Sequence, residues 1–503
     1  MKKIIITVIA LIGLSCSQEE FNIVNTNQAD AKRVLANAND FQNFNISNHS
    51  ALFSNQIGFQ GVFFRGLADQ FSTTNAFSGF WSFCDQPRRQ IINSTSNDDL
   101  ASQAAGPWNA FNSVINNANI VIDNIENQGG QVIVGESDLT NQELAAAYFD
   151  KGIAQGYLAL IYDKAYIVNP DTDPNALQFS TYQEVFNAAV INIEKAIQLA
   201  NQLSSFEYQV YPGGQILDAA YFVQLANSYL ARLSIGLPRT DSEAQSLDYN
   251  IILNYANNGI SENFSPAATE SVFFNNLQDW SIFALGDGAG YMPTDQKIPH
   301  LVDPTYPTDY PTDEAIILDP AISNGDPRFE EYYEYVGENF GFLRASRGRY
   351  LFSSYRTKKF FNDNDQNQSG IPTNIMSAAE MDYIRAECYY RLGNFAAAVA
   401  ALDASPRKTV GNLDTTVAGP NILNALLYEV SIELDLASGI CVEWWFMRRH
   451  DMLQAGSPTM YPVPASELEI SQDEIYTFGG PATAGEPGTA SGSNDWRKID
   501  LVY

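Results

Sequence analysis

Apolar side chains recur at intervals of three and four residues over several long stretches of the chain, the pattern of amphipathic helices. The first clear stretch carries one apolar face, formed by Trp108, Phe111, Ile115, Ala118, Ile122 and Ile125. The pattern returns over residues 142–166, where Gly152 and Gly156 are small enough to let a second helix approach closely. We expect residues 182–202 to supply that second helix, and Trp108 to lie in the core.

Two further stretches show the same pairing of helical patterns. Residues 218–236 form one pattern, and residues 249–258 can pair with it. Residues 377–402 contain two helical patterns joined by a turn at Gly393, the second of them rich in alanine. A helix, a glycine turn and an alanine-rich helix are typical of a tetratricopeptide (TPR) unit. The sequence therefore predicts a mostly α fold made of irregular TPR-like helix pairs.

Helical periodicity is absent from three long segments, which are 68–102, about 262–370 and the chain after Gly456. Glycine, proline, aspartate and tyrosine dominate the middle one. Long irregular segments in a compact domain usually carry function. We therefore expect the helical scaffold to hold a loop-rich ligand-binding portion.

Composition excludes several classes of protein. The chain has 503 residues, of which 58 are acidic and 28 basic, and its net charge is −30. Nucleic acid is excluded as a partner, because binding to phosphates depends on lysine and arginine. The three histidines and four cysteines are scattered, and no Walker, HExxH or GxSxG motif occurs, so we expect no metal, no cofactor and no catalytic residue. Four residues in apolar helical patterns are expected to be buried: Cys388, Cys441, Trp444 and Trp445.

The N-terminus has the pattern of a lipoprotein signal peptide. Two lysines precede an apolar run over residues 4–14, which is too short to span a bilayer. The run leads directly to Cys16, as in a bacterial lipobox, where the cysteine is lipidated and becomes the new N-terminus; an ordinary secretory signal is the alternative. We expect residues 1–15 to be removed, residues 16–503 to form the mature chain, and acyl chains on Cys16 to anchor it to a membrane.

Short motifs in the second half follow one another in a fixed order. They are Asn324-Gly325-Asp326-Pro327-Arg328, Tyr383-Ile384-Arg385-Ala386-Glu387 with Leu392-Gly393-Asn394, residues 426–449, and Tyr461-Pro462-Val463-Pro464 with Glu467-Leu468. In this order and spacing the chain resembles the SusD/RagB family of nutrient-binding outer membrane lipoproteins of the Bacteroidetes. The resemblance covers essentially the whole mature chain, with an N-terminal part over about 16–260 and a C-terminal part over about 261–503. Ser431 and residues 437–440 depart from the family's usual residues.

The resemblance implies a SusD-like α-α superhelix at the cell surface, held in the outer membrane through the lipid on Cys16. It implies a non-catalytic protein that captures a glycan and passes it to a SusC-like TonB-dependent transporter, its expected partner. Two alternatives remain open. One is a surface-anchored helical glycoside hydrolase, which needs two carboxylates about 5–10 Å apart across a cleft. The other is a TPR scaffold for outer-membrane protein assembly.

The candidate ligand contacts lie in the irregular segments. A glycan has apolar C–H faces and a rim of hydroxyls, so we expect exposed aromatic rings beside forked polar side chains. The segment over 69–89 has that composition, through Trp81, Phe83, Asn75, Asp85 and Arg88, with Arg89 adjacent. The central region adds Trp280 and Tyr291, and after them Tyr306 and Tyr310.

Each of these aromatic residues also has a packing alternative. Trp81 can pack beneath its own loop, and Tyr306 and Tyr310 can stack on the prolines around them. The strongly negative charge of the chain disfavours polyanionic glycans unless Arg88 or Arg89 reverses it locally. We therefore expect a neutral glycan.

Overall fold

The computed structural model describes residues 35, 37–57, 60–73, 79, 81–96, 99–211, 214–266, 293–309, 316–337, 353–359 and 374–502. The signal peptide and the predicted site residues Cys16, Asn75, Trp280, Tyr291 and Tyr310 lie outside the described residues. Within them, helices prevail and the named strands form only two-stranded pairs, so the predicted mostly α fold is confirmed. None of the helices in the described ranges is long and apolar enough to cross a membrane.

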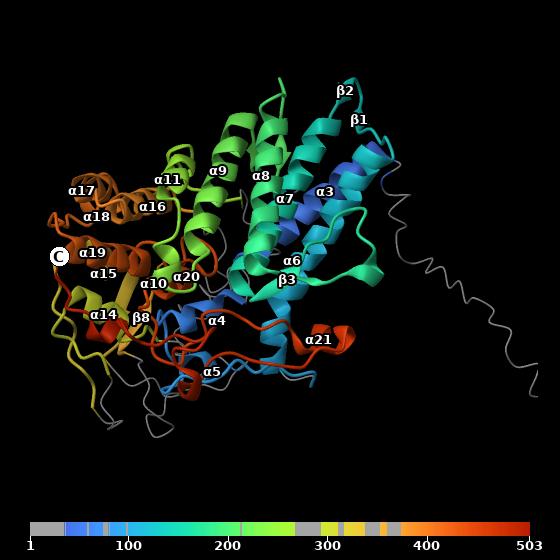
Figure 1. Cartoon of the computed structure of the whole chain (residues 1–503). Coiled ribbons are helices and arrows are strands. Elements are labelled where there is room, and N and C mark those ends of the chain that lie inside the picture. The colour runs from blue at the N-terminus through green and yellow to red at the C-terminus, as the bar shows by residue number, and fades with distance from the viewer. Residues whose placement is uncertain are drawn as a thin grey trace, which may run out of the picture.

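A row of long helices forms one side of the molecule. Figure 1 shows α7, α8 and α9 lying side by side, with α6 and α3 next to α7. Their bounds are Ala38–Ser54 (α3), Asp99–Ile122 (α6), Thr140–Ile161 (α7), Tyr182–Ala200 (α8) and Ala219–Gly236 (α9). α8 begins with a capping box in which Thr181 and Glu184 exchange hydrogen bonds, so local sequence fixes its start. The predicted pairing of α7 with α8 is confirmed.

Two glycines in α7 set how closely its neighbours approach. A Cβ atom at Gly152 would lie 2.6 Å from Cγ1 of Ile193 in α8 and 2.9 Å from the carbonyl oxygen of Ala189. A Cβ atom at Gly156 would overlap the side chain of Leu233 in α9. Because both positions are bare, two helices reach the backbone of α7, which is buried along nearly its whole length.

A second group of helices continues the row (Figure 1). α11 packs on α9 and on α16, and α17 turns back along α16. The turn is at Gly393, whose φ is +74°, and the Asn394 side chain caps α17 by accepting a hydrogen bond from the Ala397 N–H. The predicted TPR-like pair is therefore confirmed. The bounds are Tyr249–Asn257 (α11), Ala378–Arg391 (α16), Phe395–Ala404 (α17), Pro406–Thr409 (α18), Gly419–Ile432 (α19) and Val442–Arg449 (α20).

The helical pattern over residues 142–166 extends beyond the helix, so the expectation of helix after 161 is wrong. α7 stops at Ile161, and the chain continues as β3 (Lys164–Tyr166), which pairs antiparallel with β4 (Phe179–Thr181). The aromatic rings at the paired ends of these strands stack with centroids 4.4 Å apart. Pairing with β4, which is distant in sequence, and the ring stacking therefore outweigh the local helical periodicity in residues 164–166.

The remaining elements are short. The helices are Gln60–Leu67 (α4), Trp81–Cys84 (α5), Asp241–Ala244 (α10), Lys297–Val302 (α14), Pro327–Tyr332 (α15) and Ala465–Ser471 (α21), with a π-helix over Asp123–Asn127 and 3₁₀ turns at Pro174–Ala176, Pro481–Thr483 and Trp496–Lys498. The strand pairs are Ile133–Val134 with Ser137–Asp138 (β1, β2), Tyr208–Gln209 with Ile216–Leu217 (β5, β6), and Tyr333–Tyr335 with Tyr355–Thr357 (β7, β8). In Figure 1, α5, α21 and the last, red part of the chain lie below the row of long helices.

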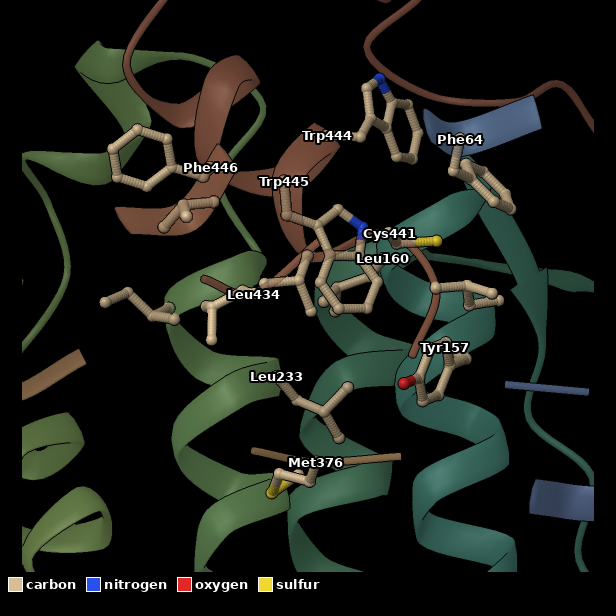
Figure 2. Close-up of a cluster of buried hydrophobic side chains, with 14 of the residues drawn as sticks. Phe64, Tyr157, Leu160, Leu233, Met376, Leu434, Cys441, Trp444, Trp445 and Phe446 are labelled. Atoms are coloured by element: carbon tan, nitrogen blue, oxygen red, sulfur yellow. The ribbon is translucent and has the colours of Figure 1, made fainter. Parts of the chain in front are cut away.

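The predicted core residues are buried. Figure 2 shows Trp445 of α20 close to Leu160 of α7, and Trp444 close to Phe64 of α4. Trp108, Trp444 and Trp445 are at most 2% exposed, so their assignment to the core is confirmed. Cys388 and Cys441 are buried thiols, as expected.

Two buried arginines beside this core satisfy the ends of α7 and α9. Arg448 donates to the carbonyl oxygens of Leu160 at 2.8 Å and Gly236 at 2.7 Å. Arg239 donates to the carbonyl oxygen of Tyr162 at 3.0 Å. The last carbonyl groups of a helix have no hydrogen-bond partner within the helix. A cation at this end also interacts favourably with the negative end of the helix dipole. These two side chains therefore fix where the long helices end, immediately above the loop-rich side.

Candidate ligand-binding site

An open depression of about 820 Å³ lies on the loop-rich side of the molecule. Residues 85–90, directly after α5, form one wall, and Gly480, Pro481 and Ala482 form the other. The two walls are joined by backbone hydrogen bonding, since the Ile91 N–H donates to the Phe478 carbonyl at 3.0 Å. Gly479, with φ of +98°, allows this approach, because a Cβ atom there would lie 2.8 Å from the carbonyl oxygen of Arg89.

Asp85 and Arg89 line this depression, and Trp81, which is not in the lining, lies against Arg89. Trp81 is partly exposed, and the guanidinium carbon of Arg89 lies 4.2 Å from the centre of its ring. Arg89 also forms an ion pair with Asp85, four residues away, and its side chain is 52% exposed. Burial raises the pKa of Asp85, while the positive charges of Arg89 and Arg88 lower it. Arg89 therefore offers exposed donors beside the partly exposed Trp81 ring, whereas the Asp85 side chain is buried and paired with Arg89.

Phe83 and Arg88 lie beneath the loop, which differs from the expectation that they face a ligand. The Phe83 side chain is 7% exposed and packs on Phe63 with ring centroids 4.9 Å apart. Arg88 is 2% exposed, donates to the Phe83 carbonyl, and forms an ion pair with Asp69. In this structure both residues hold the loop in place. Their side chains are occupied by the protein itself.

Asp69 joins this loop to the C-terminal part of the chain. Besides its ion pair with Arg88, it accepts hydrogen bonds from Gln454 Nε2 and from Trp496 Nε1, each at 2.9 Å. All four side chains are buried. Since a buried carboxylate needs charged or polar partners, this network fixes the segment that carries Trp81 against residues more than 380 positions later.

Tyr306, from the central region, lies in the core. Its side chain is 6% exposed, and its ring centre is 6.3 Å from that of Tyr355. His300 Nδ1 lies 2.6 Å from its carbonyl oxygen. The structure thus places Asp85 in the lining of the depression with its side chain buried, puts Trp81 against Arg89 beside that lining, and places Tyr306 among packed side chains.

Several lining residues were missed by the sequence reasoning, namely Gln86, Pro87, Gln90, Gly480, Pro481 and Ala482. Glycine and proline at 479–481 mark a turn in the sequence. Nothing in the sequence indicates that this turn lies opposite residues 85–90. That placement depends on the long-range backbone bonds described above.

Solved structures with this arrangement of helices include SusD-like proteins. No protein-family model matches the sequence, and no curated protein matches it. A SusD homolog from Bacteroides thetaiotaomicron superposes with a TM-score of 0.61 at 12% identity, over 87% of this chain and 97% of that one. A SusD-like protein from Bacteroides fragilis gives 0.56 at 13%, over 83% and 86%, and a SusD-like carbohydrate binding protein from Bacteroides vulgatus gives 0.55 at 16%, over 82% and 83%. This chain therefore has the fold of the SusD superfamily.

Proposed function

We propose that this protein is a cell-surface lipoprotein of the outer membrane that captures a glycan, without cleaving it, for a SusC-like TonB-dependent transporter. The observation that carries the proposal is an open depression lined by Arg89, with the partly exposed Trp81 ring against that arginine, on a SusD-like fold. One solved protein of that fold is described as carbohydrate binding. The lipobox at Cys16 supplies the anchor in this proposal.

The chemistry of the depression suits a sugar. A pyranose ring can place its C–H face on Trp81, and its hydroxyls can bond to Arg89 and to the amides of Gln86 and Gln90. An aromatic contact contributes about 0.5–1.5 kcal/mol beyond the area it buries. A few such contacts give a dissociation constant in roughly the micromolar to millimolar range, which permits release to a partner. The exposed Arg89 side chain covers part of the Trp81 ring, so a stacked sugar shares or displaces it.

The local charges favour a neutral glycan. Arg88 is buried and paired with Asp69, and Arg89 is paired with Asp85. Neither arginine therefore offsets the net charge of −30 that the sequence carries. The negative electrostatic potential of the protein repels polyanionic glycans, most strongly at low salt concentration.

Isothermal titration of the full chain against a panel of oligosaccharides tests capture. We expect micromolar to millimolar binding of a neutral glycan, weakened about tenfold in Trp81→Ala and largely retained in Trp81→Phe. Ile191→Ala is the matched control, because Ile191 is 65% exposed on α8 and lies outside the lining of the depression. Capture by this site is refuted by equal binding in Trp81→Ala or by release of reducing sugar. A twofold preference for polyanionic glycans at low salt refutes the expectation of a neutral glycan.

The anchor and the partner need separate tests in cells. Cys16→Ala is expected to abolish labelling with a fatty-acid probe and to release the protein from the membrane fraction. Affinity purification of the lipidated protein is expected to recover a TonB-dependent transporter. Unchanged membrane retention of the Cys16→Ala protein contradicts the lipid anchor, and recovery without any transporter contradicts the partner.

A further inference from the structure

A second cavity, of about 280 Å³, lies far from the loops, near the upper end of the helical row. It is enclosed by α3, the β1–β2 hairpin, the start of α7 and the β5–β6 hairpin. In Figure 1 these hairpins and helix ends lie across the molecule from α5. The cavity has room for several waters or for a small organic molecule. No part of the glycan site proposed above contributes to it.

The charges in the lining of this cavity are negative. Glu143 and Glu207 are its carboxylates, and the described lining contains neither lysine nor arginine. Glu207 is exposed at the rim, whereas Glu143 is 5% exposed. The net charge of −30 adds to the attraction of a cation from a distance.

Glu143 is held only by neutral donors. Its carboxylate accepts hydrogen bonds from Asn45 Nδ2 at 2.8 Å, and from Gln42 Nε2 and Gln142 Nε2 at 3.4 Å each. No ion pair to Glu143 occurs within the described ranges. Glu143 lies in the first turn of α7. The cavity thus contains a fixed, nearly buried negative charge that no cation of the described chain balances.

His49 adds a second acceptor to the same cavity. Its ring is 2% exposed, and Nδ1 lies 2.6 Å from Oδ2 of Asp150. Asp150 also accepts hydrogen bonds from Asn48 at 3.1 Å and Tyr208 at 3.0 Å, which assigns the Nδ1 proton to the imidazole. In the neutral ring Nε2 is then an acceptor, and it has no partner among the described residues.

We propose that this cavity binds a small organic cation whose ammonium or guanidinium group donates N–H bonds to Glu143 and His49. Such a group supplies the charge that Glu143 lacks, and its donors match both acceptors. Ile46, Leu139 and Ile216 in the lining can contact an attached carbon chain. This proposal does not depend on glycan capture at Trp81.

Titration of the full chain with agmatine at pH 8 and low salt tests the site. We expect millimolar or tighter binding, reduced at least tenfold in Glu143→Gln and two- to threefold in Glu207→Gln. Glu469→Gln is the matched control, because it removes the same charge from an exposed position on α21. Tetramethylammonium, a cation without N–H donors, is expected to bind at least tenfold more weakly than agmatine.

Three outcomes overturn the proposal: no agmatine binding by the unchanged protein at 10 mM or below, equal binding of tetramethylammonium, or an equal loss in the Glu469→Gln control. Circular dichroism reports whether Glu143→Gln folds. Should it fail to fold, the Glu207→Gln variant and the tetramethylammonium comparison still decide the question. Unchanged glycan binding in the same variants separates this cavity from the glycan site.

Discussion

One buried histidine shows how fixed charges determine the response to pH. The Arg391 guanidinium can only donate, so His450 Nδ1, 3.0 Å from its Nη2, must accept. His450 Nε2 then carries the proton and donates to Glu387 at 2.9 Å. Burial lowers the pKa of His450 to about 4, although Glu387 opposes the shift. Burial alone would raise the pKa of Glu387, but the positive charge of Arg449 and the hydrogen bonds from Arg449 and His450 hold it well below its ordinary value.

These shifts predict loss of stability in mild acid. In the unfolded chain His450 takes up a proton near its ordinary pKa of 6.5, whereas in the folded protein its pKa is about 4. Between those pH values the unfolded state binds more protons, so the free energy of unfolding falls as the pH falls. Below 4.5, Glu387 adds a loss of the same sign. Urea unfolding at pH 4.5, 5.5, 7 and 8 measures the slope.

A glutamine in place of His450 provides the comparison. Its amide can keep both neighbours satisfied without titrating, so His450→Gln is expected to be less sensitive to pH between 6.5 and 4. Some dependence remains, because burial also lowers the pKa of His300. An identical slope in the variant and the unchanged protein contradicts the assignment to His450.

For single residues, the sequence gives the chemical type of each side chain but does not predict whether that side chain faces solvent or the core. Trp81 and Phe83 are both aromatic and two positions apart, yet one is partly exposed and the other packs on Phe63. Arg88 and Arg89 are neighbours, yet only Arg88 is buried. Which of each pair faces solvent depends on the single turn of α5 and on partners such as Asp69, and no local pattern contains that information.

Among the elements, the long helices follow directly from the sequence. Periodicity predicts α7, α8, α9, α11, α16 and α17, because an apolar face repeating every three to four residues specifies both a helix and its buried side. The strand at Lys164–Tyr166 does not follow from periodicity, because its partner lies in a separate segment. Packing in α7 offers a test that compares two glycines within one helix.

Gly152→Ala is expected to destabilise the protein by about 1–3 kcal/mol, because the new methyl group meets the carbonyl oxygen of Ala189 at 2.9 Å, which moves only with α8. Gly156→Ala meets the flexible end of Leu233, and the higher helix propensity of alanine, worth about 1 kcal/mol, offsets much of the cost. Denaturant midpoints of the two variants measure the difference. Equal or reversed losses would falsify this account of the spacing between α7 and α8.

For the molecule as a whole, the glycan site depends on the tie between Asp69 and residues near the end of the chain. Arg88→Ala leaves the buried Asp69 carboxylate without its positively charged partner, so the free energy of unfolding is expected to fall by about 3–5 kcal/mol. The adjacent Arg89→Ala removes a half-exposed arginine from a pair whose carboxylate, Asp85, is buried, and it is expected to cost less than Arg88→Ala, in which both partners are buried. The double change Asp69→Asn with Arg88→Met is expected to recover much of the loss. Urea unfolding ranks the three, and a similar cost for both arginine variants argues against the tie.

Family motifs and helical patterns predict the overall architecture from the sequence, whereas the composition of the glycan site is only half predicted. The segment containing Trp81 and Asp85 has a recognisable composition. The opposite wall, Gly480 to Ala482, reads as an ordinary turn. The two walls meet through contacts such as the hydrogen bond from Thr477 to the carbonyl oxygen of Ile91, 386 residues apart in sequence. No pattern within either segment indicates a contact with a residue so far away in the sequence.

That separation has a consequence for biosynthesis. Most of the helical row is encoded by Ala404, but the second wall and the Trp496 bond to Asp69 are encoded near the end of the chain. A ribosome therefore finishes the scaffold well before the pocket can close. Products of early translation stop or of tail clipping would keep a helical body while losing the second wall of the proposed binding site.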